Sequence, residues 1–186
     1  MARHYARQGS PVTIVNPARV FGPELLTEGN SVTRMIQWYL AGRWRLLPAG
    51  DRHANWAFID DVVRGHLLAM EHGAPGQRYV LGGENASLRR LFDLIAEISG
   101  RRYRLFPVPA AAARTAAVIE RSRAEWFRHY PLITPDWVRC FERDWACASA
   151  KAEREIGYSV TPLRQALQKT IESLSGERKE ESCATF

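Results

Sequence analysis

Residues 12–23 have the sequence VTIVNPARVFGP, and this stretch decides the fold. Its first four residues form a short apolar run rich in β-branched side chains, which predicts a buried parallel strand. The Asn-Pro and Gly-Pro pairs that follow interrupt regular structure, so residues 16–23 are predicted to form a loop. Residues 2–8, ahead of the run, end at Gly9 with Pro11 beyond, a pattern typical of the end of a helix.

The alternation of strands and helices continues downstream. Asp60 or Asp61 is predicted to cap a helix with Val63, Leu67 and Met70 along one face. Strands followed by helices, and then mostly helix, indicate an α/β layer that merges into a helical part. The other predicted elements are strands at 56–59 and 77–81, and helices at 31–41, from Ser87 to Gly100, at 110–128, from Thr134-Pro135 and from Thr161-Pro162.

The composition is that of a globular protein, with 46% hydrophobic and 25% charged residues among 186. No apolar stretch reaches the length of about 18 residues that a membrane span requires. The N-terminus, MARHYARQGS, lacks the apolar core of a signal peptide, so export is not expected. The three cysteines fit neither a disulfide framework nor a zinc site, so we expect a cytoplasmic location and no metal.

The net charge of +6 raises the question of a polyanionic partner. Most of the excess lies within residues 101–128, which do not form a recognisable module of basic residues interleaved with stacking aromatic residues. The pattern favours solvated helix faces and no nucleic-acid partner. A basic nucleic-acid-binding module is kept as the weakest alternative.

Four segments of the chain form a recognisable series. They are VTIVNPARVFGP at 12–23, FIDDVV at 58–63 with LAME at 68–71, RYVLGGEN at 78–85, and SAKA at 149–152 with EIGY at 155–158. In this order they resemble the extended short-chain dehydrogenase/reductases, a family that includes nucleotide-sugar epimerases and dehydratases, dihydroflavonol reductases and 3β-hydroxysteroid dehydrogenases. The resemblance covers about residues 1–175.

The resemblance implies a two-part enzyme. In this family a Rossmann domain binds NAD(P), the C-terminal part forms the substrate pocket, and a Tyr-x-x-x-Lys pair provides acid/base chemistry for hydride transfer. The chain would then be the C-terminal remnant of a Rossmann-type sheet, a few strands, plus a mainly helical substrate-binding part. Its expected boundaries are 1–176, with 177–186 a charged, disordered tail.

The departures from the family pattern concern the cofactor side. No G-x-G-x-x-G motif follows a strand, and no tyrosine has a lysine four residues on. By position, residues 2–8 would be the last turns of the catalytic helix. The chain is therefore expected to be truncated and inactive alone, with no catalytic residue assigned. NAD or NADP would belong to the complete enzyme.

The resemblance assigns binding roles to the loop after the first strand. By position, Pro17 and Val20 would lie beside the nicotinamide ring of the cofactor. Arg19 and Phe21 would lie near the substrate, with Phe21 in place of the more usual tyrosine.

Two further substrate-binding residues, Asn55 and Trp56, match the Asn-aromatic pair of the dihydroflavonol-reductase branch. Nucleotide-sugar enzymes commonly place a diphosphate-binding Arg where this chain has Ala54, while Arg52 comes two residues early. We therefore favour the dihydroflavonol-reductase or hydroxysteroid-like branch and expect a small carbonyl or alcohol substrate, with a sugar-like substrate kept as the other possibility. The adjacent Asp60 and Asp61 point in different directions, which favours a helix cap and a structural hydrogen bond over a carboxylate pair.

The leading hypothesis is thus the substrate side of an NAD(P)-dependent epimerase/dehydratase-type reductase. The missing N-terminal half would lie on another chain or have been lost. The alternative is a non-catalytic subunit or remnant whose open sheet edge pairs with a partner half, or with a second copy.

Overall fold

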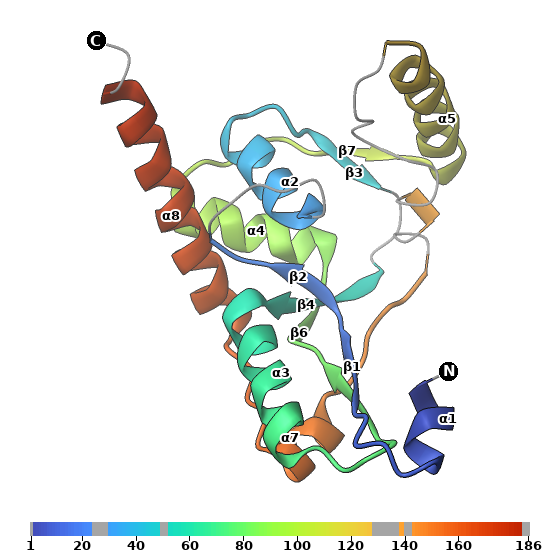
Figure 1. Cartoon of the computed structure of the whole chain (residues 1–186). Helices are drawn as coiled ribbons and strands as arrows, with labels where there is room; N and C mark the ends of the chain where they lie inside the picture. The colour runs from blue at the N-terminus through green and yellow to red at the C-terminus, as the bar shows by residue number, and fades with distance from the viewer. Residues whose placement is uncertain (1, 24–29, 49–51, 128–137, 140–142, 184–186) are drawn as a thin grey trace.

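The computed structural model of the chain describes residues 2–23, 30–48, 52–127, 138–139 and 143–183 (Figure 1). The fold is α/β, as the sequence predicts. The helices are α1 (Ala2–Arg7), α2 (Ser31–Leu40), α3 (Ile59–His72), α4 (Leu88–Ser99), α5 (Ala110–Phe127), α7 (Ala150–Ile156) and α8 (Leu163–Cys183). The strands are β1 (Ile14–Pro17), β2 (Arg19–Phe21), β3 (Leu46–Pro48), β4 (His53–Phe58), β5 (Arg78–Leu81), β6 (Glu84–Ser87) and β7 (Phe106–Val108).

The strands form three short sheets. β1 pairs in parallel with β5, and β3 pairs in parallel with β7. In the third sheet β4 is central, with β2 parallel on one side and β6 antiparallel on the other. In Figure 1 the β1–β5 pair continues into the β2–β4–β6 sheet, so these strands form one curved ribbon through the molecule.

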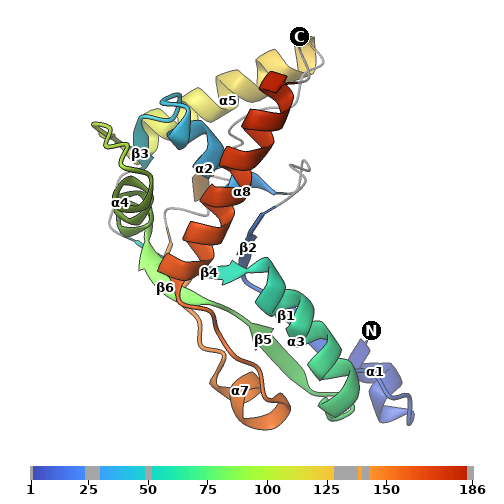
Figure 2. The same cartoon turned by 90° about the vertical axis from the view of Figure 1, so that its left-hand side faces the viewer.

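Helices cover this ribbon at two places, and each place has its own apolar core. Helices α2, α4 and α8 pack together near β2 and β4, around the buried residues Phe21, Trp56 and Leu91. Helices α3 and α7 pack near β1 and β5, around Tyr79 and Leu81. Figure 2 shows α8 alongside α4 and, at the other end, α3 and α7 near β5, where the two helices also contact each other.

Several predicted helices are confirmed with their end signals. The helix at 2–8 is α1, and Gly9 beyond it has φ +89°, a conformation that glycine adopts most readily. The Ser87 side chain accepts a hydrogen bond from the Arg90 N–H at 3.2 Å and so caps α4. The helices at 31–41 and 110–128 are α2 and α5.

The prediction of a loop at 16–23 is wrong for most of its length. β1 extends to Pro17, and β2 occupies 19–21. The prediction rested on the local preference of proline for loops. Pro17 is nevertheless tolerated in strand β1, because β1 is paired on one side only among the described strands. The short strands β3, β6 and β7 were not predicted, since three or four residues carry little periodic signal.

Helix α3 differs from its prediction in two ways. Phe58 is its N-cap residue and makes no side-chain capping hydrogen bond, so neither Asp60 nor Asp61 caps it. Its face with Val63, Leu67 and Met70 is exposed, while Asp61 and Ala69 are among its buried residues.

Two predictions concern segments that lie partly or wholly outside the described residues. Helix α8 continues to Cys183, into the stretch 177–186 that composition predicts to be a disordered tail. The helix predicted from Thr134-Pro135 lies outside the described residues. Within the described ranges, none of the helices combines the length and apolarity needed to cross a membrane.

Candidate functional site

A cavity of about 400 Å³ lies where β1 ends and β2 begins. Its walls come from residues 16–19, from Asn55 and Val80, and from residues 144–147, which we call the strap. In α/β sheets the carboxyl ends of parallel strands are the usual place for a ligand. Of the predicted site residues, the structure brings Pro17, Arg19 and Asn55 together here.

The β1–β2 side of the cavity is held to the sheet by main-chain contacts. Ala18 N–H donates to the Leu81 carbonyl at 3.1 Å, which continues the parallel pairing of β1 with β5. Pro17 is exposed at this rim, so its ring is accessible to a ligand. The Arg19 guanidinium lies over the Trp56 ring at 5.8 Å, a cation–π contact.

Asn55 holds together the floor of the cavity. Its Oδ1 accepts a hydrogen bond from Gly83 N–H at 2.6 Å, and its Nδ2 donates to the Gly83 carbonyl at 2.8 Å and to Asn85 Oδ1 at 2.9 Å. A longer bond of 3.4 Å reaches the Cys147 carbonyl. The side chain is buried, and both its amide N–H groups and its oxygen bond to neighbouring parts of the chain, so its evident role is to shape the floor.

Three other predicted site residues lie away from the cavity wall. Phe21 and Trp56 are fully buried in the core near α2 and α4, and the Trp56 indole N–H donates to the Ala86 carbonyl at 2.9 Å. Val20 is half-buried and packs against the core beneath α3. The substrate and cofactor roles of all six residues stay predictions.

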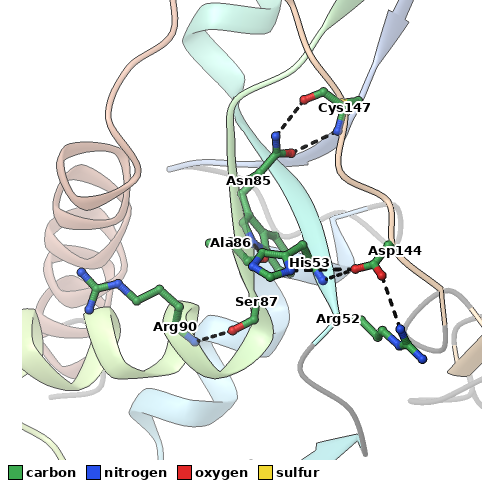
Figure 3. Close-up of polar contacts among 9 residues, drawn as sticks. Arg52, His53, Asn85, Ala86, Ser87, Arg90, Asp144 and Cys147 are labelled. Carbon is green, nitrogen blue, oxygen red and sulfur yellow. Dashed lines mark hydrogen bonds and ion pairs between the residues drawn. The ribbon is translucent and has the colours of Figure 1, made fainter.

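The strap reaches β4 from about 90 residues further along the chain, and Figure 3 shows its anchors. Asp144 Oδ1 accepts a hydrogen bond from His53 N–H at 2.8 Å, and Asp144 Oδ2 pairs with Arg52 at 3.4 Å. Trp145 N–H donates to the His53 carbonyl at 2.9 Å and forms a parallel bridge with Ala54.

The far end of the strap is clamped by one amide side chain. Asn85 Oδ1 accepts from Cys147 N–H at 3.1 Å, and Asn85 Nδ2 donates to the Cys147 carbonyl at 2.9 Å (Figure 3). Sequence reasoning missed the strap. The one feature of the sequence that could have indicated the strap is its place directly before the SAKA segment at 149–152.

The charges at the site are compensated. The hydrogen bond from His53 N–H, with the Arg52 charge in addition, lowers the pKa of Asp144 and favours its carboxylate. Burial raises the pKa of the Cys147 thiol, which therefore stays protonated and has little nucleophilic character.

The tyrosines with shifted acidity lie outside the cavity and have structural roles. Burial, and secondarily the Asp61 charge, raises the pKa of Tyr158, whose hydroxyl donates to the Gly82 carbonyl at 2.8 Å. Burial also raises the pKa of Tyr39. A phenol that ionises less readily than usual is unsuited to act as a base near neutral pH.

The described residues offer a place for the nicotinamide ring of a cofactor, but the β5–β6 turn offers none for its pyrophosphate. The exposed Pro17 beside the cavity leaves room for a flat ring. The glycines at the β5–β6 turn do not form a phosphate cradle, because a Cβ on Gly83 would collide with the Trp56 carbonyl and one on Gly82 would lie 2.8 Å from Asn55 Oδ1. These glycines permit close packing of the chain on itself, so this turn does not provide a pyrophosphate site.

Comparisons with known proteins agree with this architecture. The model of the NAD-dependent epimerase/dehydratase family matches residues 1–82. A putative dihydroflavonol 4-reductase from Synechocystis is 28% identical over 174 residues, which are 89% of this chain and 49% of that protein. The crystal structure of a nucleoside-diphosphate-sugar epimerase from Pseudomonas aeruginosa superposes with a TM-score of 0.70 at 29% identity, over 95% of this chain and 52% of that one.

A third relative shows the fold in a cofactor complex. The structure of a UDP-glucuronic acid 4-epimerase from Bacillus cereus with NAD has a TM-score of 0.62 at 20% identity, over 90% of this chain and 45% of that one.

The fold and the place of the cavity define an α/β protein of the Rossmann-like class. More narrowly, the comparisons support the resemblance of its four segments to the extended short-chain dehydrogenase/reductases. It spans about half the length of the curated relatives it matches.

Proposed function

We propose that the chain forms the substrate side of an NAD(P)-dependent reductase or epimerase-type oxidoreductase that acts on a small carbonyl or alcohol. The observation that carries the proposal is the cavity at the end of β1, which collects Pro17, Arg19 and Asn55 at one place. A nicotinamide cofactor would supply the hydride acceptor or donor of the reaction. The residues of this chain would hold and orient the substrate beside it.

The contacts of the cavity indicate how this orientation works. Asn55 and Asn85 fix the floor and the strap, so the walls are already in place before a ligand binds. Arg19 is the one basic residue along the described lining, and its contact with Trp56 fixes its direction. Arg52, the candidate for a diphosphate, is paired with Asp144, which supports a substrate without a diphosphate.

The proposal predicts that the chain needs a cofactor-binding half supplied from elsewhere. Calorimetric titration of the purified chain with NADPH is expected to show no saturable binding in the micromolar range, since no G-x-G-x-x-G motif follows a strand in this sequence to bind the pyrophosphate. A fusion that places the first half of the Synechocystis relative ahead of this chain is expected to oxidise NADPH with a panel of small ketones. Micromolar NADPH binding by the chain alone, or an inactive but folded fusion, would contradict the proposal.

A second candidate function, a non-catalytic subunit that pairs with a partner half, is favoured by one exposed surface. Val63, Leu67 and Met70 lie one turn apart on α3 and are 54%, 52% and 75% exposed. The neighbouring strand β1 is paired only with β5 among the described strands. Two-stranded parallel sheets are rarely left open, because both faces and edges are normally covered. We propose that a polypeptide with a parallel strand and a helix docks on this edge.

The docking proposal predicts that polar substitutions on α3 abolish binding of the partner and leave the stability of the chain nearly unchanged. Val63, Leu67 and Met70 are replaced together by glutamine. Each substitution is expected to change the free energy of unfolding by about 0.5 kcal/mol or less, since these side chains are exposed. The same variant is expected to lose co-elution with a co-expressed first half of the Synechocystis relative in size-exclusion chromatography. Its matched control changes Val118 and Ile119, which are similarly exposed on α5. Equal co-elution of both variants would rule out α3 as the docking surface.

A further inference from the structure

We propose that Trp145 is the wall on which the cavity stacks a flat, uncharged ring of its ligand. This inference deepens the proposed substrate-side function and rests on it for the identity of the ligand as a substrate. The sequence motifs assign residues on the β1–β2 side of this site. The inference adds a specificity-determining residue on the strap and names the class of ligand.

The first argument is the exposure of the indole. Trp145 lines the cavity and keeps 51% of its surface exposed, although tryptophans are usually well covered in a folded chain. The backbone beneath it is fixed, because its N–H donates to the His53 carbonyl at 2.9 Å and it bridges to Ala54. An exposed aromatic ring on a fixed backbone at a cavity offers a surface on which another ring can stack.

The second argument is the character of the other walls. Pro17, Ala18, Val80 and Ala146 contribute apolar or small surfaces. The charged lining residues are one cation, Arg19, and one anion, Asp144, so the described wall has no net charge to attract a polyanion. The volume of about 400 Å³ falls within the range of about 300–1,000 Å³ that small-molecule sites occupy.

The third argument is the contrast with a second exposed tryptophan. Trp126 is 86% exposed on α5 and is not part of the cavity wall. Trp126 is also an exposed indole, but it does not line the cavity. It therefore provides a matched control.

The test is direct binding of simple probes to the purified chain without any cofactor. The probe is 1-tetralone, a neutral bicyclic aromatic ketone, and the comparison ligand is uridine diphosphate; affinities are measured by ligand-observed NMR titration. Trp145→Ala is expected to weaken tetralone binding about tenfold, which corresponds to about 1.4 kcal/mol. Trp145→Phe, which keeps an aromatic face, is expected to retain most of the affinity, and Trp126→Ala to bind as the unmodified chain does.

The outcomes separate this inference from the proposed function. Unchanged tetralone affinity in Trp145→Ala, no tetralone binding by the unmodified chain, or tighter binding of uridine diphosphate than of tetralone would each overturn the inference. Circular dichroism checks that every variant is folded. If Trp145→Ala is not folded, Trp145→Leu, which also removes the aromatic face, takes its place and is expected to weaken tetralone binding similarly. Tetralone binding that depends on Trp145, together with a fusion that does not oxidise NADPH, would support the inference and contradict the proposed reaction.

Discussion

Replacing Asp61 by alanine is expected to lower the free energy of unfolding by about 3 kcal/mol, because a buried charged hydrogen-bond network loses its centre. Asp61 is 1% exposed. Its carboxylate accepts hydrogen bonds from Thr161 N–H at 2.6 Å, from the Thr161 hydroxyl at 2.8 Å and from Arg64 at 2.7 Å. These bonds join the first turn of α3 to the segment before α8. The alanine variant would leave Thr161 N–H without this acceptor in a partly buried place.

The adjacent residue provides the control for this prediction. Asp60 is exposed in the same helical turn, so Asp60→Ala removes the same charge near the start of α3 without breaking the network. We expect a change of about 0.5 kcal/mol or less for Asp60→Ala. Urea denaturation followed by circular dichroism measures both variants. Similar losses in the two variants would mean that the Asp61 effect is a general charge effect and not the loss of its three hydrogen bonds.

Replacing Asn55 by alanine is expected to lower the free energy of unfolding by about 3 kcal/mol, since a buried amide is removed together with its four hydrogen bonds to Gly83, Asn85 and Cys147. Gly83 would lose bonds at both its N–H and its carbonyl. Asn85 would keep its own bonds to Cys147, so the strap stays attached at that point. The variant therefore tests the floor of the cavity separately from its wall.

Denaturation of Asn55→Ala and of a matched variant, Asn16→Ala, measures this effect. Asn16 also lines the cavity but is exposed, and its replacement is expected to change stability by about 0.5 kcal/mol or less. A stability of Asn55→Ala equal to that of Asn16→Ala would show that the amide network contributes nothing to the fold.

The sequence predicts those parts of the fold that depend on neighbours along the chain. The Ser87 cap, the αL glycine Gly100 after α4 and the apolar stripe of α2 are all local signals, and the structure confirms them. The strand ahead of Asn16 is confirmed as well, although its bounds shift by two residues. A strand is defined by its partner, and the partner of β1 lies more than 60 residues away.

The parts that sequence reasoning missed depend on contacts between distant segments. Helix periodicity identified the stripe of Val63, Leu67 and Met70, but could not say which side of α3 meets the sheet. The buried residues of α3 are instead Asp61, Val62, Gly65 and Ala69. At Gly65 the absence of a side chain allows the close approach of Leu81 and Tyr158. The strap could not be predicted at all, because only the folded structure brings it to β4.

The way the strap is fastened has a consequence for how such a cavity can diversify. At Trp145 and Cys147 the fastening hydrogen bonds are made by main-chain atoms, which every residue type except proline provides. Exchange of the side chains at these positions would leave the fastening unchanged. Ligand preference and folding stability can therefore drift independently at this wall, so that relatives with one common scaffold could acquire different substrates through a few substitutions in a four-residue segment.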